Sequence, residues 1–325
     1  MSTIRFDTLG DGLAVHAEWD DTILDALLRS GAAVPFYCRA GLCGQCRSIL
    51  VSGEVEDVGA SPQLLTPAQR QQGEILLCRC RAVTDCEIRP ANPIASVAPS
   101  EWPESAEVES VQMLDEHFLH LRVKSGNADE FNFRAGQYTR VLDGAGDLAL
   151  IPRMFIASRP GMAILDFYLP AHASTASSPA LRAGSPIRLA KPMGSASLRE
   201  DAAGPVLGIA QGAGLGSLIG MLHQLTVTKP APRAHFFVYS AHEFVLERML
   251  TRLARDAGIE AVIARTPAGL RDALDTRLSA IRAEPTSAKI QAYVKAGRDI
   301  AKLARESLFA HGVRPWETHV DTLNE

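Results

Sequence analysis

Four cysteines are spaced as the ligands of a metal centre. Cys38, Cys43 and Cys46 are separated by four and two residues, and Cys78 follows after a further thirty-one. Three thiolates in one loop with a fourth standing alone suit an iron–sulfur centre with two irons, whereas structural zinc normally joins two close pairs of ligands. We therefore predict a [2Fe-2S] cluster on these four residues, with a zinc site or a buried set of reduced thiols as the alternatives.

The residues around these cysteines agree with a cluster loop. Gly41 and Gly44 let the backbone wrap closely around an inorganic core and aim its N–H groups at sulfur, as bulkier residues do not. Arg39 and Arg47 add positive charge beside an anionic centre. The loop thus combines the thiolates, backbone freedom and charge that such a cluster requires.

The flanking sequence predicts a small mixed fold. Two strand-like stretches open the chain, and Asp20 or Asp21 is expected to cap a helix through ILDALLRS that Gly31 ends. With these elements, PFYCRAGLCGQC and EILLCRC resemble the β-grasp domain of plant-type ferredoxins over nearly all of residues 1–90. We assign this domain to residues 1–92. Cys80 and Cys86, which follow the last ligand, are expected to be structural residues rather than reactive thiols.

The rest of the chain predicts two further domains. Residues 93–107 are rich in proline and small residues and indicate a linker. Residues 108–202 carry alternating segments punctuated by Gly, Asn and Asp, which predict an antiparallel barrel. Residues 203–325 change to apolar strands alternating with helices, which predicts a parallel sheet with right-handed crossovers. The expected fold class is α+β and α/β multidomain.

Several short motifs in the barrel resemble, in order, the flavin-binding barrel of the ferredoxin–NADP reductase family. They are Gly136-Gln137-Tyr138, PRMFIASRP, HASTASSPAL and Lys191-Pro192-Met193-Gly194. In that family an Arg-x-Tyr-Ser motif places a ring against the isoalloxazine, a hydroxyl near flavin N5 and an arginine on the phosphates. The resemblance implies FAD rather than FMN, because the branch with an N-terminal ferredoxin domain contains FAD.

This chain departs from the central flavin motif. Matched without a gap, Pro152, Met154 and Phe155 stand at the Arg, Tyr and Ser positions; with one residue deleted, Arg153 and Phe155 supply the charge and the ring. We favour the second register because phosphate binding needs a cation and stacking needs a ring, with a core role for Phe155 as the alternative. Both registers lose the hydroxyl.

The flavin contacts that the resemblance implies come from the barrel strands and from a serine-rich segment, whose hydroxyls suit a pyrophosphate but are equally explained by a solvated loop. They are Tyr138, Arg153, Met154, Phe155, Ile156, Ser174, Ser177 and Ser178.

The C-terminal third resembles the nicotinamide-nucleotide domain of the same family, with changes at its reactive positions. Gly212 and Gly214 follow a strand and open a helix, where backbone N–H groups and the helix dipole hold phosphate. The family's Gly-Gly-Thr-Gly-Ile-Ala-Pro is altered around them, and Lys295 begins the stretch that replaces Cys-Gly-x-Pro. The chain also ends without an aromatic to cover a flavin. These changes imply weak or absent direct use of NAD(P)H, with ordinary drift in a working reductase as the alternative; Arg265 is expected to be an exposed strand-end residue.

Charge and hydropathy exclude several classes of function. The net charge is -4, the pI is about 6.2, and no Lys/Arg run is long enough to act as a phosphate-binding arm, so we expect no direct binding to nucleic acid. The N-terminus lacks the apolar stretch of a signal peptide, and no segment approaches the roughly 18 apolar residues that span a bilayer. We expect a cytoplasmic protein.

Three functions remain open at this stage. The first is a redox-sensing regulator of aromatic degradation that moves electrons between FAD and the cluster and works through a ferredoxin and a transcription-factor partner. The second is an NAD(P)H-dependent reductase component that supplies a Rieske-type aromatic-ring dioxygenase. The third, a scaffold without cofactors, conflicts with the intact set of four cysteines.

Overall fold

The computed structural model divides the chain into two units, residues 1–101 and 102–325, and each is described by itself. The described residues are 2–8, 11–17, 21–30, 32, 34, 36, 41, 44–57, 64–91, 104–126, 131–142, 149–171, 181–189, 192, 194, 196–199, 204–229, 233–284, 289–314 and 317–323.

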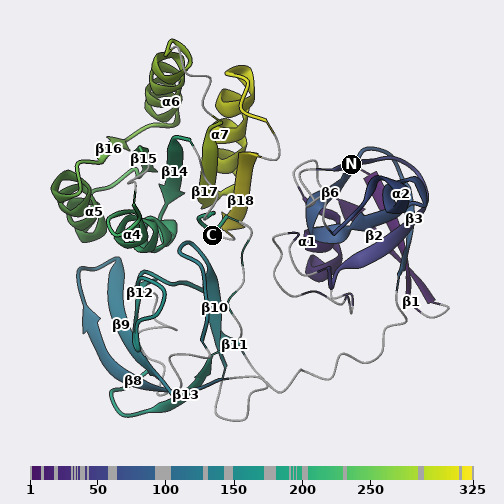
Figure 1. The fold of residues 1–325 in the computed structure, drawn as a ribbon. Coiled ribbons are helices and arrows are strands. Elements are labelled where there is room, and N and C mark those ends of the chain that lie inside the picture. The colour runs from purple at the N-terminus through teal and green to yellow at the C-terminus, as the bar shows by residue number, and fades with distance from the viewer. Residues whose placement is uncertain are drawn as a thin grey trace. The chain divides into compact units, whose positions relative to one another are not determined.

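The N-terminal unit is a five-stranded sheet in the order β2-β1-β7-β3-β5, to which α1 and a small second sheet of β4 and β6 are added (Figure 1). Its elements are β1 Ser2–Thr8, β2 Asp11–Ala17, α1 Ile23–Arg29, β3 Arg47–Ser52, β4 Val55–Asp57, α2 Pro67–Gln71, β5 Glu74–Leu76, η1 Leu77–Arg79, β6 Cys80–Ala82 and β7 Cys86–Pro90. The apolar side of α1, with Leu24 and Leu27, packs in one core with Ile4 and Phe6 of β1. This unit has the β-grasp organisation that the sequence predicts.

The start of α1 differs from the expectation that an aspartate caps it. The hydroxyl of Thr22 accepts a hydrogen bond from the backbone N–H of Asp25 at 3.1 Å and donates one to the Asp25 carboxylate at 2.7 Å. Thr22 is therefore the capping residue, since its hydroxyl serves both groups. Asp21 is buried one position earlier, and Asp20 and Gly31 lie outside the described residues.

The second unit begins with an antiparallel six-stranded sheet in the order β11-β10-β13-β8-β9-β12. Its strands are β8 Glu104–Met113, β9 Phe118–Ser125, β10 Tyr138–Leu142, β11 Ala149–Phe155, β12 Ile164–Pro170 and β13 Pro186–Leu189. A bridge between Ile156 and Phe167 joins the two edges, so the sheet closes into a barrel around an apolar core. β8 starts at Glu104 and pairs with β13, so residues 104–107 belong to the barrel and not to the predicted linker.

A parallel five-stranded sheet in the order β16-β15-β14-β17-β18 follows the barrel. Its elements are β14 Val206–Gln211, α4 Gly214–Leu225, β15 Ala234–Tyr239, α5 Val245–Asp256, β16 Glu260–Ala264, α6 Pro267–Arg282, β17 Gln291–Gly297, α7 Arg298–Ala310 and β18 Thr318–Leu323. One apolar cluster joins α4 and α5 to one face of the sheet, and another joins α6 and α7 to the opposite face. Strands buried on both faces read as continuous apolar runs, such as AHFFVY in β15.

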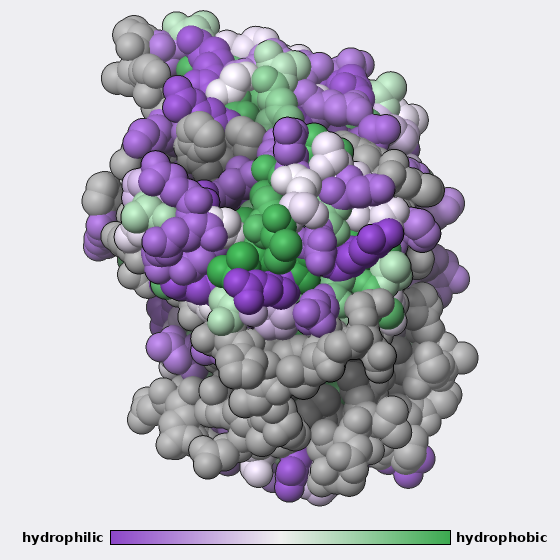
Figure 2. All heavy atoms as spheres, turned by 90° about the vertical axis from the view of Figure 1, so that its right-hand side faces the viewer, coloured by the Kyte–Doolittle hydropathy of each residue, from purple (hydrophilic) through white to green (hydrophobic). Residues whose placement is uncertain are grey.

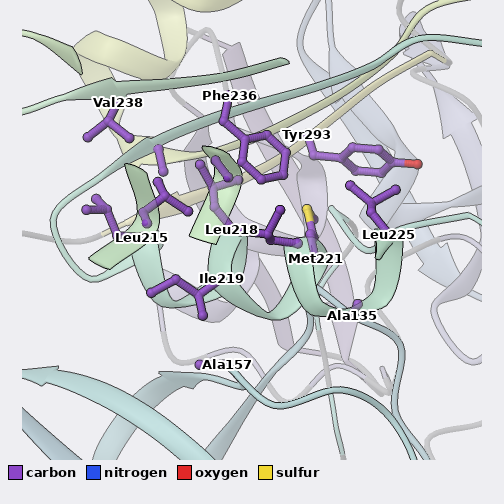
Figure 3. Close-up of a cluster of buried hydrophobic side chains, with 14 of the residues drawn as sticks. Ala135, Ala157, Leu215, Leu218, Ile219, Met221, Leu225, Phe236, Val238 and Tyr293 are labelled. Atoms are coloured by element: carbon purple, nitrogen blue, oxygen red, sulfur yellow. The ribbon is translucent and has the colours of Figure 1, made fainter. Parts of the chain in front are cut away.

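Helix α4 forms the boundary between this sheet and the barrel (Figure 3). Its Leu215 and Leu218 lie in the cluster with Phe236 of the sheet, while Ile219 faces Ala157 of the barrel. The approach is close: a Cβ at Gly220 would lie 2.5 Å from the carbonyl oxygen of Ile156, and one at Gly214 would lie 2.2 Å from that of Lys295. Only glycine permits this contact, so the helix and its neighbours pack as one body.

A second contact joins the barrel to the start of α5. The Asp115 carboxylate, in the turn between β8 and β9, accepts hydrogen bonds from the backbone N–H of Val245 at 2.9 Å and from those of His117 and Phe118 at 2.9 and 2.8 Å. Phe244 packs edge-on against both His117 and Phe118. Burial alone would raise the pKa of Asp115, but the three hydrogen bonds outweigh it and lower the pKa.

Among the described residues, no helix is long and apolar enough to cross a membrane. On the face seen in Figure 2, polar side chains predominate among those in colour and surround one small apolar patch.

We predict that Asp115→Ala lowers the free energy of unfolding by about 1–2 kcal/mol, the usual cost of losing a helix cap. Because the folded-state pKa is lowered, the stabilisation should be complete above the ordinary value near 3.8 and disappear as the pH falls through the lowered value. Denaturant unfolding of both proteins from pH 3 to 7 measures this difference in the free energy of unfolding. Glu116→Ala is the matched control, since that side chain is 85% exposed; equal losses in the two variants would contradict the capping role.

Candidate functional site

Two of the four predicted cluster ligands lie together in the N-terminal unit. Cys46 precedes β3 and Cys78 lies in η1 after β5, and the antiparallel pairing of β3 with β5 brings them side by side. Their Sγ atoms are 3.2 Å apart, and the backbone N–H of Leu77 donates to the carbonyl of Cys46 at 3.1 Å. This separation far exceeds a disulfide bond of about 2.05 Å and approaches the roughly 3.7 Å between thiolates on one tetrahedral metal. The pair therefore fits shared ligation of one iron.

The other half of the cluster loop is described only at its glycines. Gly41 and Gly44 have φ angles of 69° and 73°, in the left-handed region that favours glycine. The predicted need for glycine at these two positions is confirmed. Cys38, Cys43 and Arg39 lie outside the described residues, so their ligand and charge roles stay predictions.

Arg47 carries its predicted positive charge next to Cys46, but that charge is partly balanced. Its guanidinium forms an ion pair with Glu74 at 2.9 Å and donates to the carbonyl of Leu64 at 2.7 Å. The side chain thus ties β3 to β5 and to the chain before α2. Arg47 therefore has two roles. It holds β3 and β5, next to Cys46 and Cys78, in register, and it offsets part of the negative charge of a cluster.

The remaining two cysteines have the properties of structural residues, as predicted. Burial raises the pKa of Cys80 to about 12, against a smaller lowering by a backbone hydrogen bond at Leu76. Burial also raises the pKa of Cys86, whose thiol donates to the carbonyls of Glu54 and Thr84. A raised pKa disfavours the thiolate that nucleophilic attack needs, which agrees with a structural role.

In the second unit, the strand geometry separates the predicted flavin residues into two groups. Tyr138 and Phe155 are partners across β10 and β11, and their rings meet edge to face with centroids 5.8 Å apart. Met154 and Ile156, on either side of Phe155, belong to the barrel core. Side chains of a strand alternate between its faces, so a ring at 155 and a core residue at 154 agree with the register that uses Phe155. Met154 and Ile156 have a packing role.

The phosphate-binding part of the predicted flavin site lies outside the described residues. The side chain of Arg153, which belongs to β11, is not among those described, and neither are Ser174, Ser177 and Ser178. Their contacts with a pyrophosphate remain predictions. Phe155 and Tyr138 are 2% and 1% exposed, so in this structure both rings pack against neighbouring residues and present no open face on which an isoalloxazine could stack.

A buried ion pair lies beside the ring pair, and the sequence reasoning had found only one of its members. The ammonium of Lys295, fully buried in β17, forms an ion pair with Asp321 and donates to the carbonyl of Gly136 at 2.6 Å. Its Nζ also lies 5.1 Å from the centroid of the Phe155 ring. A further strand, β18, follows β17, and Lys295 and Asp321 are direct partners in their parallel register. The alternation in THVDTL was the available signal for this strand.

The glycine-rich turn has a packing function in addition to the predicted phosphate role. Gly212 adopts a φ of 51°, and α4 begins at Gly214, so the strand–turn–helix arrangement is as expected. However, the first turn of α4 from Gly214 to Ser217 is buried, and the Ser217 hydroxyl donates to the carbonyl of Gly136 at 3.3 Å. The close approach of Gly214 to β17 explains this glycine without a nucleotide.

Arg265 is a partly exposed strand-end residue, as predicted, and it is bound within the chain. Its side chain is 45% exposed, and its guanidinium forms a forked ion pair with the buried carboxylate of Glu247 at 3.0 and 2.8 Å. It also donates to the carbonyl oxygens of Ser240 and His242. The guanidinium thus links the carboxyl end of β15 to α5.

The N-terminal unit matches a known domain family, and the whole chain has relatives. Residues 7–83 match the 2Fe-2S iron-sulfur cluster binding domain. The toluate 1,2-dioxygenase electron transfer component of Pseudomonas putida is 27% identical over 264 residues, which cover 78% of this chain and 74% of that protein. The ferredoxin–NAD(P)+ reductase component of the naphthalene 1,2-dioxygenase and salicylate 5-hydroxylase systems of a Ralstonia species is 26% identical over 321 residues, 95% of each chain.

Solved structures share the fold along the full chain. A cytochrome P450 reductase from Amycolatopsis superposes with a TM-score of 0.58 at 21% identity, over 99% of this chain and 98% of that one. The ferredoxin reductase in carbazole 1,9a-dioxygenase gives a TM-score of 0.56 at 21% identity with the same coverage. The chain is thus similar, along nearly its whole length, to reductase and electron-transfer components of oxygenase systems, and its residues 7–83 match the 2Fe-2S domain. The matched domain family binds a [2Fe-2S] cluster.

We predict that Cys46→Ala and Cys78→Ala each abolish the visible absorbance and the reduced-state electron paramagnetic resonance signal of the cluster, because each removes an iron ligand. Cys80→Ala is the matched control, since this cysteine is equally buried and lies two positions from Cys78. It should keep both signals at full intensity. A cluster that survives in Cys78→Ala, or is lost only in Cys80→Ala, would show that the ligand set is wrong.

Proposed function

We propose that this chain is an electron-transfer flavoprotein of the ferredoxin reductase type whose flavin exchanges electrons with a protein partner and is a poor acceptor of hydride from NAD(P)H. The observation that carries the proposal is the buried Lys295–Asp321 pair against Phe155. By resemblance, Lys295 stands where the family has the cysteine beside the nicotinamide ring. A position filled by a buried ion pair does not offer an open, apolar surface to a second ring.

The packing around the pair supports the same proposal. Asp321 also accepts a hydrogen bond from the backbone N–H of Ala196 at 3.3 Å, and a Cβ at Gly194 would lie 2.9 Å from its carboxylate. The Phe155 ring is 2% exposed and that of Tyr138 is 1% exposed. Admission of a nicotinamide to this place requires the ion pair to move, and a charge removed from its partner in a dry interior is strongly destabilised.

A flavin and an iron–sulfur cluster together determine which electron transfers the chain can carry out. A bound flavin exchanges two electrons with a hydride donor, or one at a time with an iron–sulfur centre, which carries single electrons. The role of this chain's residues would be to hold both groups: Cys46 and Cys78 the cluster in one unit, and the antiparallel barrel the flavin in the other. A ferredoxin that donates single electrons is therefore a suitable partner.

The relatives support a partner in oxygenase systems. Among them are a reductase component of propane 2-monooxygenase from Mycolicibacterium smegmatis and the toluate 1,2-dioxygenase component described above. We propose a ferredoxin or an oxygenase component as the partner, in aromatic degradation. We further propose that a chain with impaired use of NAD(P)H reports the redox state of that ferredoxin to a transcriptional regulator.

The second candidate is the NAD(P)H-dependent reductase component itself. The retained strand–turn–helix at Gly212 and the ferredoxin–NAD(P)+ activity in the name of the Ralstonia relative favour it. The two candidates share the cofactors and differ in the electron donor, so one kinetic measurement separates them.

We predict that anaerobic mixing with NADH or NADPH bleaches the flavin of the purified chain slowly, while a chemically reduced [2Fe-2S] ferredoxin bleaches it rapidly. Stopped-flow absorbance at the flavin and cluster bands measures both rates, and the Ralstonia reductase component serves as the positive control for NAD(P)H. Rapid bleaching by stoichiometric NADH would establish the second candidate. A colourless preparation would exclude both.

The regulatory role has a separate test. The reduced chain should transfer its electrons to, or form a complex with, a transcriptional regulator encoded beside the same degradation genes, and the oxidised chain should bind it with different affinity. Isothermal titration calorimetry of the two redox states measures this difference. Equal affinity in both states, without electron transfer, would contradict redox sensing.

A further inference from the structure

The guanidinium of Arg47 joins three segments of the N-terminal unit that surround the two described cluster ligands. Arg47 follows Cys46 at the start of β3, and its guanidinium pairs with Glu74 of β5 at 2.9 Å. It also donates to the carbonyl of Leu64 at 2.7 Å. β5 leads directly into η1, which carries Cys78. One side chain thus connects the strand after Cys46 to the strand before Cys78.

The same residue supports the cluster loop at a glycine. The backbone N–H of Arg47 donates to the carbonyl of Gly44 at 3.1 Å. A Cβ placed on Gly44 would lie 3.9 Å from Nη2 of Arg47 and 3.9 Å from the side chain of Leu64, so this face of the loop backbone is turned toward the guanidinium. In the sequence, Gly44 lies between the predicted ligand Cys43 and Cys46. Arg47 therefore contacts the loop as well as the two strands.

A guanidinium suits this place better than another cation would. Its planar fork can donate to a carboxylate and to a carbonyl at the same time, whereas an ammonium is a compact point charge. The side chain of Arg47 is 26% exposed and that of Glu74 is 18% exposed, so most of both surfaces is shielded from water. A shielded, forked contact holds its segments in one arrangement. In that arrangement the Sγ atoms of Cys46 and Cys78 are already 3.2 Å apart without a metal between them.

We propose that Arg47 is a positioning residue for the cluster, and that its contacts with Glu74, Leu64 and Gly44 limit the rate at which the cluster loses iron. Release of iron requires its thiolates to move apart, and the segments that carry them separate only after these hydrogen bonds break. The restraint comes from the fork of the guanidinium and not from its positive charge alone. The proposal rests on the cluster of the matched domain family and is independent of the flavin and of the electron donor.

The test compares variants of the full chain that have been loaded with the cluster. An excess of an iron chelator is added, and the decay of the visible absorbance of the cluster gives the rate of iron release. Arg47→Met should release iron about tenfold faster, because one hydrogen bond to a charged group contributes at least such a factor. Arg47→Lys keeps the charge but loses the fork, and it should also release iron several times faster. Glu74→Gln should stay closer to the wild type, since its amide oxygen still accepts.

The electron paramagnetic resonance spectrum of the reduced cluster is the second readout. Its g values depend on how the ligands are oriented, so they should shift in both Arg47 variants. Arg89→Met removes an exposed cation from β7, the strand beside β3, and should change neither readout. Leu24→Ala leaves a cavity in the core of the same unit and should lower the melting temperature without shifting the g values.

Three results would overturn the proposal. The first is unchanged iron release in both Arg47 variants. The second is wild-type behaviour of Arg47→Lys, which would assign the effect to charge. The third is faster release with unchanged g values, in proportion to the loss of melting temperature as in Leu24→Ala, which would leave Arg47 a general structural role.

Variants that do not take up the cluster are also informative. If Arg47→Met cannot be loaded, Arg47→Lys replaces it in both measurements. Failure of both Arg47 variants to load, while Leu24→Ala loads normally, would support the positioning role. A wild-type chain that binds no cluster would overturn the assignment of the cluster itself, and with it this proposal.

Discussion

Close approach of backbone to backbone along α4 is the constraint on which the second unit depends. At Gly214 the helix meets β17, and at Gly220 it meets the barrel at Ile156, each at a distance that leaves no room for a Cβ. A helix held on both sides in this way leaves no layer of water or of larger side chains between barrel and sheet. The apolar cluster of Figure 3 is continuous across that boundary, so the two parts gain the stability of a shared core.

The ion pair of Lys295 and Asp321 adds a directional contact to the boundary between the barrel and the parallel sheet. The stabilisation from apolar contact is roughly proportional to the buried area, so it changes little when two apolar surfaces slide past each other. An ammonium with two oxygen partners, by contrast, is satisfied in only one arrangement. Removal of one member of such a pair typically costs about 3–5 kcal/mol, because the other is left charged and dry. The pair therefore fixes the position of the barrel loop at Gly136 relative to β17 and β18.

Local spacing allowed the sequence to predict the cluster and the order of the folds, while contacts between distant strands were beyond it. The cluster cysteines can be recognised from the sequence because the spacing of ligands within one loop is a short-range property. Asp321 was missed because its pairing with Lys295 depends on the register of two parallel strands joined by a helix. The sequence predicts Asp20 or Asp21 as the cap of α1, whereas the cap is Thr22, a choice among neighbouring capping residues that only backbone geometry decides. The glycine-rich pattern predicts phosphate binding at Gly214, but it does not indicate the packing role that this glycine has against β17.

The contact between Cys46 and Cys78 has a consequence for folding. The two residues are 32 positions apart, so ligation of one iron closes a long loop of the N-terminal unit. A covalent link across a loop of this length restricts the unfolded chain by about 3–4 kcal/mol, on the model used for disulfides. Metal binding that occurs only in the folded state adds its free energy to folding. Assembly of the cluster would thus also stabilise the fold of this unit.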